Sequence, residues 1–574
     1  GATRPTDSRL HNRWRRAQLA QAPFPILSIP VVLVKAFNWS NPYPTMRIPV
    51  FARNVVSTSH PLAAQAGLRM MLAGGNAVDA AIAAAAAITL IEPVSCGLGG
   101  DAFAIVWDGK ALQGLNASGW SPAAWNTDYF SRKYGVNAKG LANAPKRGVD
   151  TITIPGVVSG WAALHERFGK LPFEDLMAPA IEIAERGTAV PPVVAQKWAA
   201  AVPELKDQPG FAQTFMPNGR APAVGERFVF REAAETLRRI GRTRGRDVYE
   251  GQTAEAIIAH IQAHGGVHTL SDLRDYRPDW VTPIARRYRD YTLHEIPPNG
   301  QGISALMALG ILDQFDLRSL AVDSVESQHI QIEAMKLAMA DLYRYVSDPR
   351  SMEVTPAQML EDTYLASRAR LIDPARATTF TPGMPATGGT IYLTAADESG
   401  MMISFIQSNY MGFGSGVVVP GTGVSLQNRG VGFSMDPVSP NVVEGHKRPF
   451  HTIIPGFLTR AGRPVMSFGV MGGDIQPQGH VQTVVRMVDY DQQPQAACCA
   501  PRWKLNRDFT LDVESTMRSQ TIAGLQAMGH QLKAIDDPYM DFGSGQFIWR
   551  LSDDTEDGYV AASDSRRDGQ AVGF

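Results

Sequence analysis

Residues 387–394 read Thr-Gly-Gly-Thr-Ile-Tyr-Leu-Thr and set a threonine directly behind two glycines. The β-branched and aromatic residues after Thr390 predict a strand that begins at this threonine. If the bond between Gly389 and Thr390 is cut, Thr390 carries a hydroxyl nucleophile and, on the same residue, an α-amine that can take its proton. An α-amine titrates near about pH 8, so a useful fraction is neutral at pH 7. The octet therefore indicates an N-terminal threonine nucleophile, and its alternative is an ordinary strand start after a glycine turn.

Size and charge limit the kinds of protein this chain can be. Its 574 residues exceed what one hydrophobic core usually serves, so the chain can bury a deep site. The 54 basic and 55 acidic side chains nearly balance, which leaves no electrostatic footprint for nucleic acid or an anionic membrane. The apolar run at 80–91 is too short to span a bilayer. We expect small-molecule partners, without nucleic acid or membrane.

Cysteine and histidine usage argues against a metal or disulfide framework. Cys96 stands alone and Cys498 adjoins Cys499. The sequence therefore predicts neither a disulfide framework nor a CxxC metal site. The 12 histidines form no cluster with ligand spacing, and we predict no cofactor and no metal. Scarce cysteine favours a reducing compartment, so we expect a cytoplasmic protein, with the periplasm as the alternative.

The predicted secondary structure changes at Thr390, from mainly helices before it to mainly strands after it. Residues 1–53 read as a partly irregular N-terminal extension, 54–389 as a helix-rich segment and 390–574 as a strand-rich segment. Residues 350–388 look like an exposed linker that leads to the threonine. The strands after 390 need helices from the earlier segment to cover their faces. We therefore predict an α/β fold, a four-layer αββα sandwich formed jointly by the two segments.

Three further positions could serve a threonine nucleophile. Ser408 follows Thr390 by eighteen residues, a distance that lets a hairpin place its hydroxyl beside the nucleophile. Gly472 and Gly473 end a predicted strand before a helix expected from Gln478, where bare backbone N–H groups could stabilise an oxyanion. The alternatives are a backbone-bonded buried hydroxyl and a tight strand-to-helix turn.

Two more side chains could contact a substrate. Arg429, between an amide and a glycine, could pair with a substrate carboxylate, although most arginines are solvated or structural. His451 could shape the pocket, and the alternative is a satisfied structural histidine.

These motifs together resemble the gamma-glutamyltranspeptidase family of N-terminal nucleophile hydrolases. The resemblance runs in the same order through roughly residues 54–574. The motifs that carry it are Gly75-Asn76-Ala77-Val78-Asp79-Ala80, Ile91-Glu92-Pro93, Gly97-Leu98-Gly99-Gly100, Pro155-Gly156, Thr390, the G-x-x-x-S-F-I-Q-S-N frame, Phe413-Gly414, Lys447-Arg448-Pro449, Gly472-Gly473 and Ala562-Ser563-Asp564-Ser565-Arg566.

The resemblance implies a mechanism and its residues. It implies cleavage before Thr390 into a large and a small subunit, the N-terminal nucleophile hydrolase type of αββα fold, and an acyl-enzyme on the Thr390 hydroxyl. Gly472 and Gly473 would form the oxyanion hole, and Ser408 stands where the family has a threonine bonded to the nucleophile. Water or an amine would then take the acyl group, and no cofactor is needed.

Substrate recognition departs from the family pattern. The arginine that holds the glutamyl α-carboxylate is matched by Ser118, and the aspartate for the α-amine by Gly432. The family's paired serines are replaced by His451 and Thr452, while a family asparagine aligns with Tyr410. The lid is reduced to 442–446, which predicts a more open pocket.

The sequence thus predicts an autoprocessing threonine amidohydrolase or acyltransferase that cleaves a small amide whose acyl part differs from glutamate. Arg429, Tyr410, His451 and Thr452 are the predicted substrate-binding residues. One alternative is a true gamma-glutamyl (glutathione) hydrolase or transpeptidase with a rebuilt clamp. An alternative of another class is an uncleaved, inactive binding or scaffold protein. Further oligomerisation of the processed pair is left open.

Overall fold

The computed structural model describes residues 35–45, 47–378, 389–537 and 542–574. Two antiparallel seven-stranded sheets form its centre. In order across the first sheet, the strands are β21 (Gln570–Gly573), β2 (Val55–Thr58), β10 (Gly389–Ala396), β11 (Met402–Tyr410), β3 (Asp101–Trp107), β4 (Leu112–Ala117) and β7 (Asp279–Val281). Across the second they are β1 (Val50–Ala52), β20 (Tyr559–Ser563), β19 (Ser544–Arg550), β15 (Arg463–Met471), β14 (Gly456–Arg460), β9 (Tyr291–Glu295) and β8 (Ile284–Tyr288).

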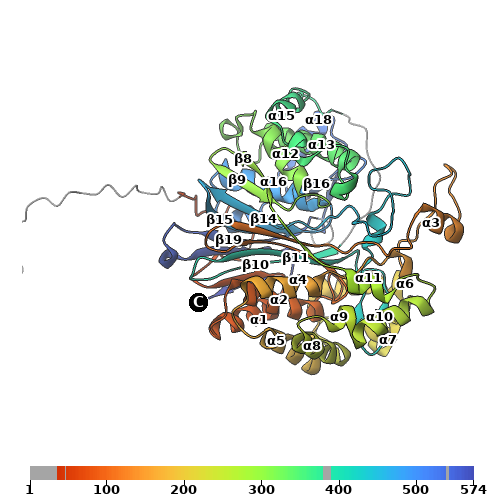
Figure 1. Ribbon diagram of the computed structural model, residues 1–574. Coiled ribbons are helices and arrows are strands. Elements are labelled where there is room, and N and C mark those ends of the chain that lie inside the picture. Colours follow the sequence, from red (N-terminus) through yellow and green to blue (C-terminus); the bar gives the residue numbers. More distant parts are fainter. Residues whose placement is uncertain (1–34, 46, 379–388, 538–541) are drawn as a thin grey trace, which may run out of the picture. The chain divides into compact units, whose positions relative to one another are not determined.

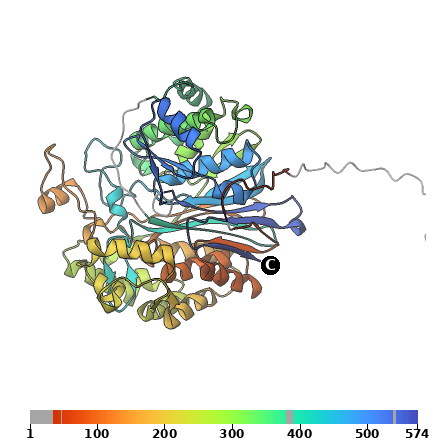
Figure 2. The same ribbon diagram turned by 180° about the vertical axis from the view of Figure 1, so that it is seen from behind.

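Helices cover the outer face of each sheet (Figure 1). Against the first sheet lie α1 (Pro61–Leu72), α2 (Ala77–Ile91) and α4 (Val157–Phe168), with α5 (Phe173–Arg186) packed on α2 and α8 (Arg231–Thr243) on α5. Against the second lie α12 (Gly302–Leu312), α16 (Ile475–Val488) and α17 (Pro494–Cys499). Outside them, α13 (Val325–Tyr345) and α15 (Asp362–Ala369) pack on α12, and α18 (Ser519–Ala527) packs on α13. The view from behind shows the same succession of helices, sheet, sheet and helices (Figure 2). The predicted four-layer αββα sandwich is confirmed.

The remaining elements are short or peripheral. The helices are α3 (Thr127–Tyr134), α6 (Pro192–Leu205), α7 (Phe211–Phe215), α9 (Asp247–Glu250), α10 (Gln252–Ala263), α11 (Leu270–Asp275) and α14 (Pro356–Met359). The small strands are β5 (Thr188–Ala189), β6 (Arg227–Phe228), β12 (Val418–Val419), β13 (Val424–Ser425), β16 (Trp503–Leu505), β17 (Leu511–Glu514) and β18 (Leu532–Ile535). Single 3₁₀ turns are η1 (Val149–Thr151), η2 (Pro217–Gly219), η3 (Leu317–Ser319), η4 (Pro349–Ser351), η5 (Arg429–Gly432) and η6 (Thr555–Asp557).

Helix α2 shows why alanine dominates the early sequence. Asn76 and Asp79 form a reciprocal capping box at its start, and every residue of the helix is buried. Small side chains let the helix lie close against β10 and β11, which both contact it. Helix α2 thus supports the strand that begins at the candidate site, β10, and the strand that ends there, β11.

The hairpin of β10 and β11 joins the two predicted segments of the chain. Strand β10 pairs with β2 from residues 54–389 on one side and with β11 on the other. Its Thr394 Oγ1 also contacts Ser467 Oγ of β15 at 2.6 Å, which ties the two sheets together. Neither segment could bury these faces alone.

Two boundary predictions are wrong. Helix α16 begins at Ile475 rather than Gln478, because Asp474 starts it and Pro477 lies within its first turn, where proline is tolerated. Residues 350–388 are not an exposed linker up to 378, because α14 and α15 lie there and bury Met359 and Leu365. Residues 379–388 lie outside the described part.

The extension is partly tied to the body. Residues 1–34 lie outside the described part, but β1 pairs with β20, and Arg47 Nη1 donates to the carbonyl of Asp564 at 2.6 Å. Within the described ranges, no helix has the length and apolarity needed to cross a bilayer.

Candidate active site

Thr390 lies at an irregularity in the β10–β11 ladder. Gly389 pairs with Tyr410 and Ile391 pairs with Gln407, so two residues of β11 oppose Thr390. The extra residue of this bulge therefore lies in β11, at Ser408 and Asn409, and a bulge re-aims the side chains of the strand that carries it. Thr390 is 1 % exposed, and its Oγ1 lies 3.4 Å from Ser408 Oγ. The hairpin thus places Ser408 beside Thr390, as the spacing predicts.

Backbone geometry fixes the neighbouring serine. Tyr410 has a φ of +76°, which is rare for a residue with a side chain. Its N–H donates to Ser408 Oγ at 2.7 Å, a bond that orients the hydroxyl toward Thr390. The strain at Tyr410 is consistent with a position held in place by its surroundings.

Gly472 and Gly473 form the turn between β15 and α16. Their φ angles are +133° and +71°, in the left-handed range that favours glycine. A side chain at Gly472 would also come within 2.9 Å of the Cα atom of Gly543. The carbonyl of Gly473 accepts a bond from Gln301 Nε2 at 2.9 Å, which anchors the turn. Both predicted glycines therefore stand where no other residue fits easily.

Gln476, in the first turn of α16, was missed by the sequence analysis. Its Nε2 donates to Thr390 Oγ1 at 3.4 Å, and its Oε1 accepts the N–H of Ile454 at 2.9 Å. The side chain is fully buried. The available signal was its place in the sequence, three residues after Gly473. If the two glycines face Thr390, the first turn of the helix that follows them must lie near Thr390 as well.

An ion pair adjoins the glycine turn. Asp474, which follows Gly473, accepts from Arg507 Nε at 2.7 Å and from Arg507 Nη2 at 2.8 Å. Both side chains are about nine-tenths buried. A bidentate pair of this kind is among the strongest polar contacts a protein makes. It holds the start of α16 from outside the helix.

Arg429 is enclosed rather than open to a substrate. It is fully buried, and its Nη1 donates to Thr452 Oγ1 at 2.9 Å. Its guanidinium carbon lies 4.1 Å from the ring centre of Tyr410, a cation–π arrangement. Burial lowers the pKa of Arg429 to about 10. The guanidinium is closed off from solvent, and direct substrate binding by Arg429 stays a prediction.

His451 is bonded to a buried carboxylate. Its Nε2 lies 2.9 Å from Asp101 Oδ2, and both side chains are fully buried. The N–H of Ile453 donates to His451 Nδ1 at 3.3 Å, so Nε2 carries the hydrogen. Burial, with the charges of Arg429 and Arg448, lowers the pKa of His451 well below its usual range. We therefore describe this pair as a neutral histidine bonded to a carboxylate.

Asp101 is the second residue that the sequence analysis missed. Its Oδ1 accepts from the N–H of Gly119 at 3.0 Å and from Gln427 Nε2 at 2.9 Å. Burial raises its pKa to about 6, while the charge of Arg429 acts in the opposite direction. The position that follows the Gly97–Gly100 loop was the only sequence signal.

The resemblance predicts that Ser118 and Gly432 replace the charged residues of a glutamyl clamp, and this match stays a prediction. Ser118 is fully buried, and its Oγ accepts from Asn299 Nδ2 at 3.2 Å. A Cβ atom on Gly432 would lie 2.6 Å from the carbonyl oxygen of Phe450. A longer side chain at either position would require its neighbours to shift.

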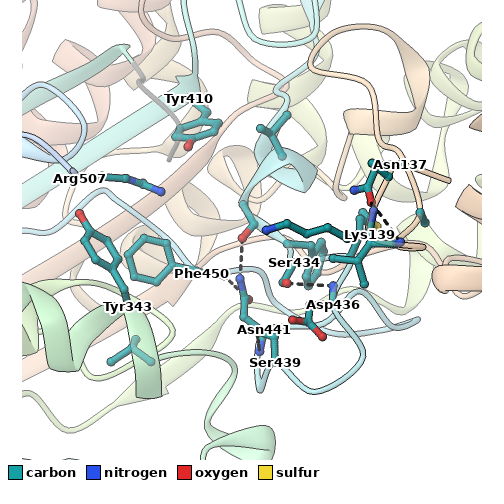
Figure 3. A pocket seen from close by; sticks show the side chains of 18 residues that line it. Asn137, Lys139, Tyr343, Tyr410, Ser434, Asp436, Ser439, Asn441, Phe450 and Arg507 are labelled. Carbon is teal, nitrogen blue, oxygen red and sulfur yellow. Dashed lines mark hydrogen bonds between the residues drawn. The ribbon is translucent and has the colours of Figure 1, made fainter. Parts of the chain in front are cut away.

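A cavity of about 710 Å³ lies beside Tyr410. Tyr343, Tyr410, Phe450 and Arg507 gather at one end of it, and Lys139 and Asp436 lie at the other (Figure 3). Val346, Val431, Phe433 and Met435 add apolar lining. The aromatic end is nearest the nucleophile candidate, because the Tyr410 N–H bonds Ser408, which touches Thr390.

One group of potential metal ligands occurs in the described residues, away from this cavity. His329, Glu333 and His530 place ligand atoms within 4.8 Å of one another. Hydrogen bonds already use them: His329 Nδ1 lies 2.8 Å from His530 Nε2, and Lys336 Nζ lies 2.6 Å from Glu333 Oε1. Lys336 Nζ is also 3.4 Å from His530 Nδ1, and this charge would repel a cation.

The structure thus brings Thr390, Ser408, Tyr410 and the Gly472–Gly473 turn into one region through Gln476. Arg429, Thr452 and His451 lie behind Tyr410 as a buried network. The roles of all these residues stay predictions at this point.

Comparison with known proteins identifies relatives over nearly the whole chain. Residues 63–574 match the model of the gamma-glutamyltranspeptidase family. The glutathione hydrolase-like YwrD proenzyme of Bacillus subtilis (strain 168) is 34% identical, covering 91% of this chain and 98% of that protein. The oxamate amidohydrolase proenzyme of Klebsiella pneumoniae is also 34% identical, with coverage of 90% and 97%.

A solved structure supports the same assignment. The crystal structure of cephalosporin acylase from Bacillus halodurans is similar with a TM-score of 0.87 at 45% identity, covering 93% of this chain and 98% of that one. The predicted resemblance and the N-terminal nucleophile hydrolase type of fold are confirmed.

Proposed function

Because the chain belongs to the gamma-glutamyltranspeptidase family, we propose that it is an autoprocessing amidohydrolase or acyltransferase whose nucleophile is Thr390. One observation carries the proposal. The buried Thr390 Oγ1 lies 3.4 Å from Ser408 Oγ and 3.4 Å from Gln476 Nε2, next to a glycine turn at the start of α16. A hydroxyl, a hydroxyl partner and an N-terminal helix turn together suit acyl transfer.

Processing uses the same hydroxyl. Thr390 Oγ1 attacks the carbonyl carbon of Gly389, the carbon–nitrogen bond breaks, and an ester forms between Gly389 and the threonine oxygen. The nitrogen of Thr390 takes up the hydroxyl proton as the carbon–nitrogen bond breaks and becomes the free α-amine. Water then hydrolyses the ester, which releases the carboxylate of Gly389 and restores the Thr390 hydroxyl. The break in register supports this step because Gly389 and Ile391 have pairing partners in β11 and Thr390 between them has none. The products are the segments 54–389, with the extension, and 390–574.

Turnover repeats the chemistry on a substrate amide. The freed α-amine takes the proton of the Thr390 hydroxyl as the oxygen attacks the amide carbonyl. Backbone N–H groups of Gly472 and Gly473, at the positive end of the α16 dipole, stabilise the oxyanion. The amine leaving group departs with a proton, and water or another amine accepts the acyl group. No cofactor enters these steps.

The pocket supports an acyl part unlike glutamate. The places for a glutamyl clamp are closed at Ser118 and Gly432, and Arg429 and His451 are engaged internally. The open space is the 710 Å³ cavity, whose aromatic end suits a planar or apolar group. Lys139, which also lines the cavity, suits a substrate that carries a carboxylate, whereas Arg507 already pairs with Asp474. Tyr410 would line the acyl site on the side nearest the nucleophile, because its N–H bonds Ser408.

The relatives bear on the chemistry but not on one substrate. Their names include oxamate amidohydrolase, acylase and glutathione hydrolase. All three names describe cleavage of an amide bond. We therefore propose a small amide as substrate, with Arg429, Tyr410, His451 and Thr452 shaping its site.

The test compares variants of two threonines on one strand. Thr390→Ala should stay a single chain on a denaturing gel and should not hydrolyse any amide. Thr390→Ser should be cut and active, at a lower rate. Thr394→Val is the matched control, because this buried residue bonds Ile403 and Ser467 instead of the site. It should be cut like the wild type. Processing or turnover by Thr390→Ala would overturn the proposal.

A substrate panel distinguishes the alternatives. Oxamate, an acylated cephalosporin nucleus, acylated aromatic amines and a gamma-glutamyl anilide should be compared at equal enzyme concentration. Preference for a non-glutamyl amide supports the altered clamp, and preference for the glutamyl compound indicates a rebuilt one. A wild-type chain that stays whole and inactive would indicate the binding or scaffold protein.

A further inference from the structure

Gln476 presents a side-chain amide to Thr390 in an orientation that its other contact fixes. Its Oε1 accepts the N–H of Ile454 at 2.9 Å. An N–H can bond only to the amide oxygen, so the amide nitrogen must face the other way. There it meets Thr390 Oγ1 at 3.4 Å. Gln476 is therefore a hydrogen-bond donor to the threonine oxygen and cannot serve as an acceptor from it.

The surroundings of Gln476 restrict the motion of its amide and exclude water from it. Gln476 and Thr390 are 0 % and 1 % exposed. The donor lies on α16, and its anchor, Ile454, lies two residues before β14, which pairs with β15. A fixed donor in a water-excluded site costs little reorganisation when charge appears beside it. Ser408 differs, because its hydroxyl can act toward Thr390 Oγ1 either as a donor or as an acceptor, while its Oγ already accepts the N–H of Tyr410.

We propose that Gln476 is a catalytic residue whose amide stabilises negative charge on Thr390 Oγ1. This rests on the proposed function, in which that oxygen is the nucleophile. As the oxygen attacks, its proton passes to a base and its charge rises. During deacylation a water oxygen bonds to the acyl carbon, the bond from that carbon to Oγ1 breaks, and the electron pair returns to Oγ1. The ammonium of Thr390 then returns the proton.

The same donor acts before the chain is cut. Attack of Thr390 on Gly389 also builds charge on Oγ1, and hydrolysis of the resulting ester releases it again. Gln476 should therefore affect processing and turnover together. The contact of 3.4 Å in the resting chain is longer than a normal bond of about 2.9 Å and should shorten as charge develops.

The first variant removes the donor with little change of volume. Gln476→Met should slow processing and lower kcat of the cut enzyme about 10-fold to 100-fold, near the range for loss of one oxyanion donor. KM should change less than about twofold, because the amide acts on the nucleophile and not on bound substrate. An unchanged kcat in correctly folded, cut protein would overturn the proposal.

The second variant tests the pH dependence of activity, which would not change if Gln476 had only a structural role. Gln476→Glu keeps the shape, but a carboxylate facing Oγ1 cannot donate, while a protonated carboxyl can. Its activity relative to wild type should therefore rise as pH falls through the pKa of the new carboxyl, which burial should raise. A ratio that is constant with pH would contradict a donor role, and this measurement carries the test if Gln476→Met does not fold.

Controls separate this proposal from the one it rests on. Gln482 lies on the same helix and is buried, and its amide bonds only Gln478 and Trp503 among the described residues. Gln482→Met and Gln482→Glu should keep the wild-type kcat and pH profile. If Thr390→Ala is inactive while both Gln476 variants match the wild type, only the role of Gln476 fails. If Thr390→Ala is active, the proposed nucleophile fails first.

Discussion

Arg507 binds both carboxylate oxygens of Asp474, at 2.7 and 2.8 Å, on the residue that follows the Gly472–Gly473 turn. The arginine comes from the loop between β16 and β17, and it also lines the cavity. One side chain thus joins the wall of the proposed substrate pocket to the start of α16. Support for the proposed oxyanion hole comes from a residue 33 positions away in the sequence.

Replacing Arg507 should weaken both stability and catalysis. Arg507→Met leaves the Asp474 carboxylate buried without its partner, which typically costs about 3–5 kcal/mol of unfolding free energy. The loosened turn should also lower kcat at least about tenfold, since misplaced donors stabilise an oxyanion poorly. Chemical denaturation and steady-state kinetics measure the two effects.

A matched arginine separates these effects. Arg239 pairs with Asp247 at 3.0 Å on the periphery, and both side chains are largely buried. Arg239→Met should lose stability but keep kcat per folded molecule. Equal kcat in the Arg507→Met and Arg239→Met proteins would show that the Asp474 contact only stabilises the fold.

A glutamyl clamp should not be recoverable by a simple exchange. Gly432→Asp restores the aspartate of the family pattern, but its Cβ would lie 2.6 Å from the Phe450 carbonyl oxygen. We expect lower thermal stability and no gain in kcat/KM for a gamma-glutamyl anilide. Gly412→Asp is the control, because its Cβ would have only an ordinary contact of 3.7 Å. A large gain for Gly432→Asp would mean that the loop can yield and that the clamp is latent.

The buried Asp101 should make stability depend on pH. Its pKa is raised to about 6 in the folded chain, so the folded state holds this proton more tightly than the unfolded state does. Stability from this group is present at low pH and is lost as pH rises from about 4 to about 6, by about 3 kcal/mol in total.

The comparison uses Asp101→Asn in the uncut Thr390→Ala background, which keeps the chain in one piece. The unfolding free energy of the parent minus that of the Asp101→Asn protein should fall between pH 4 and pH 7. Other titrating groups are shared and cancel in this difference. A difference that is independent of pH would contradict a raised pKa at Asp101.

The sequence correctly predicted the features that depend on neighbouring residues, namely the strand start, the hairpin and the glycine turn. Thr390 starts a strand because β-branched residues follow it, and Ser408 faces it because a hairpin returns after a short turn. Gly472 and Gly473 were identified because a positive φ at a strand-to-helix turn requires glycine. Layer order followed from the need to cover two sheets.

Contacts between residues far apart in the sequence could not be predicted, because no periodic pattern of residues indicates which side chains will meet. Gln476 meets Thr390 across 86 positions, and His451 meets Asp101 across 350. Each side chain alone is compatible with an ordinary buried polar residue. The burial of Arg429 behind Tyr410 is of the same kind, since an arginine beside a glycine does not reveal which ring will cover it.

The intact mass of the purified wild-type protein, with N-terminal sequencing of its smaller fragment, tests the central claim most directly. The account predicts two chains, the smaller being residues 390–574 with a free threonine at its start. Active protein that consists only of the full-length chain, or that is cut at another bond and still turns over substrate, would contradict it.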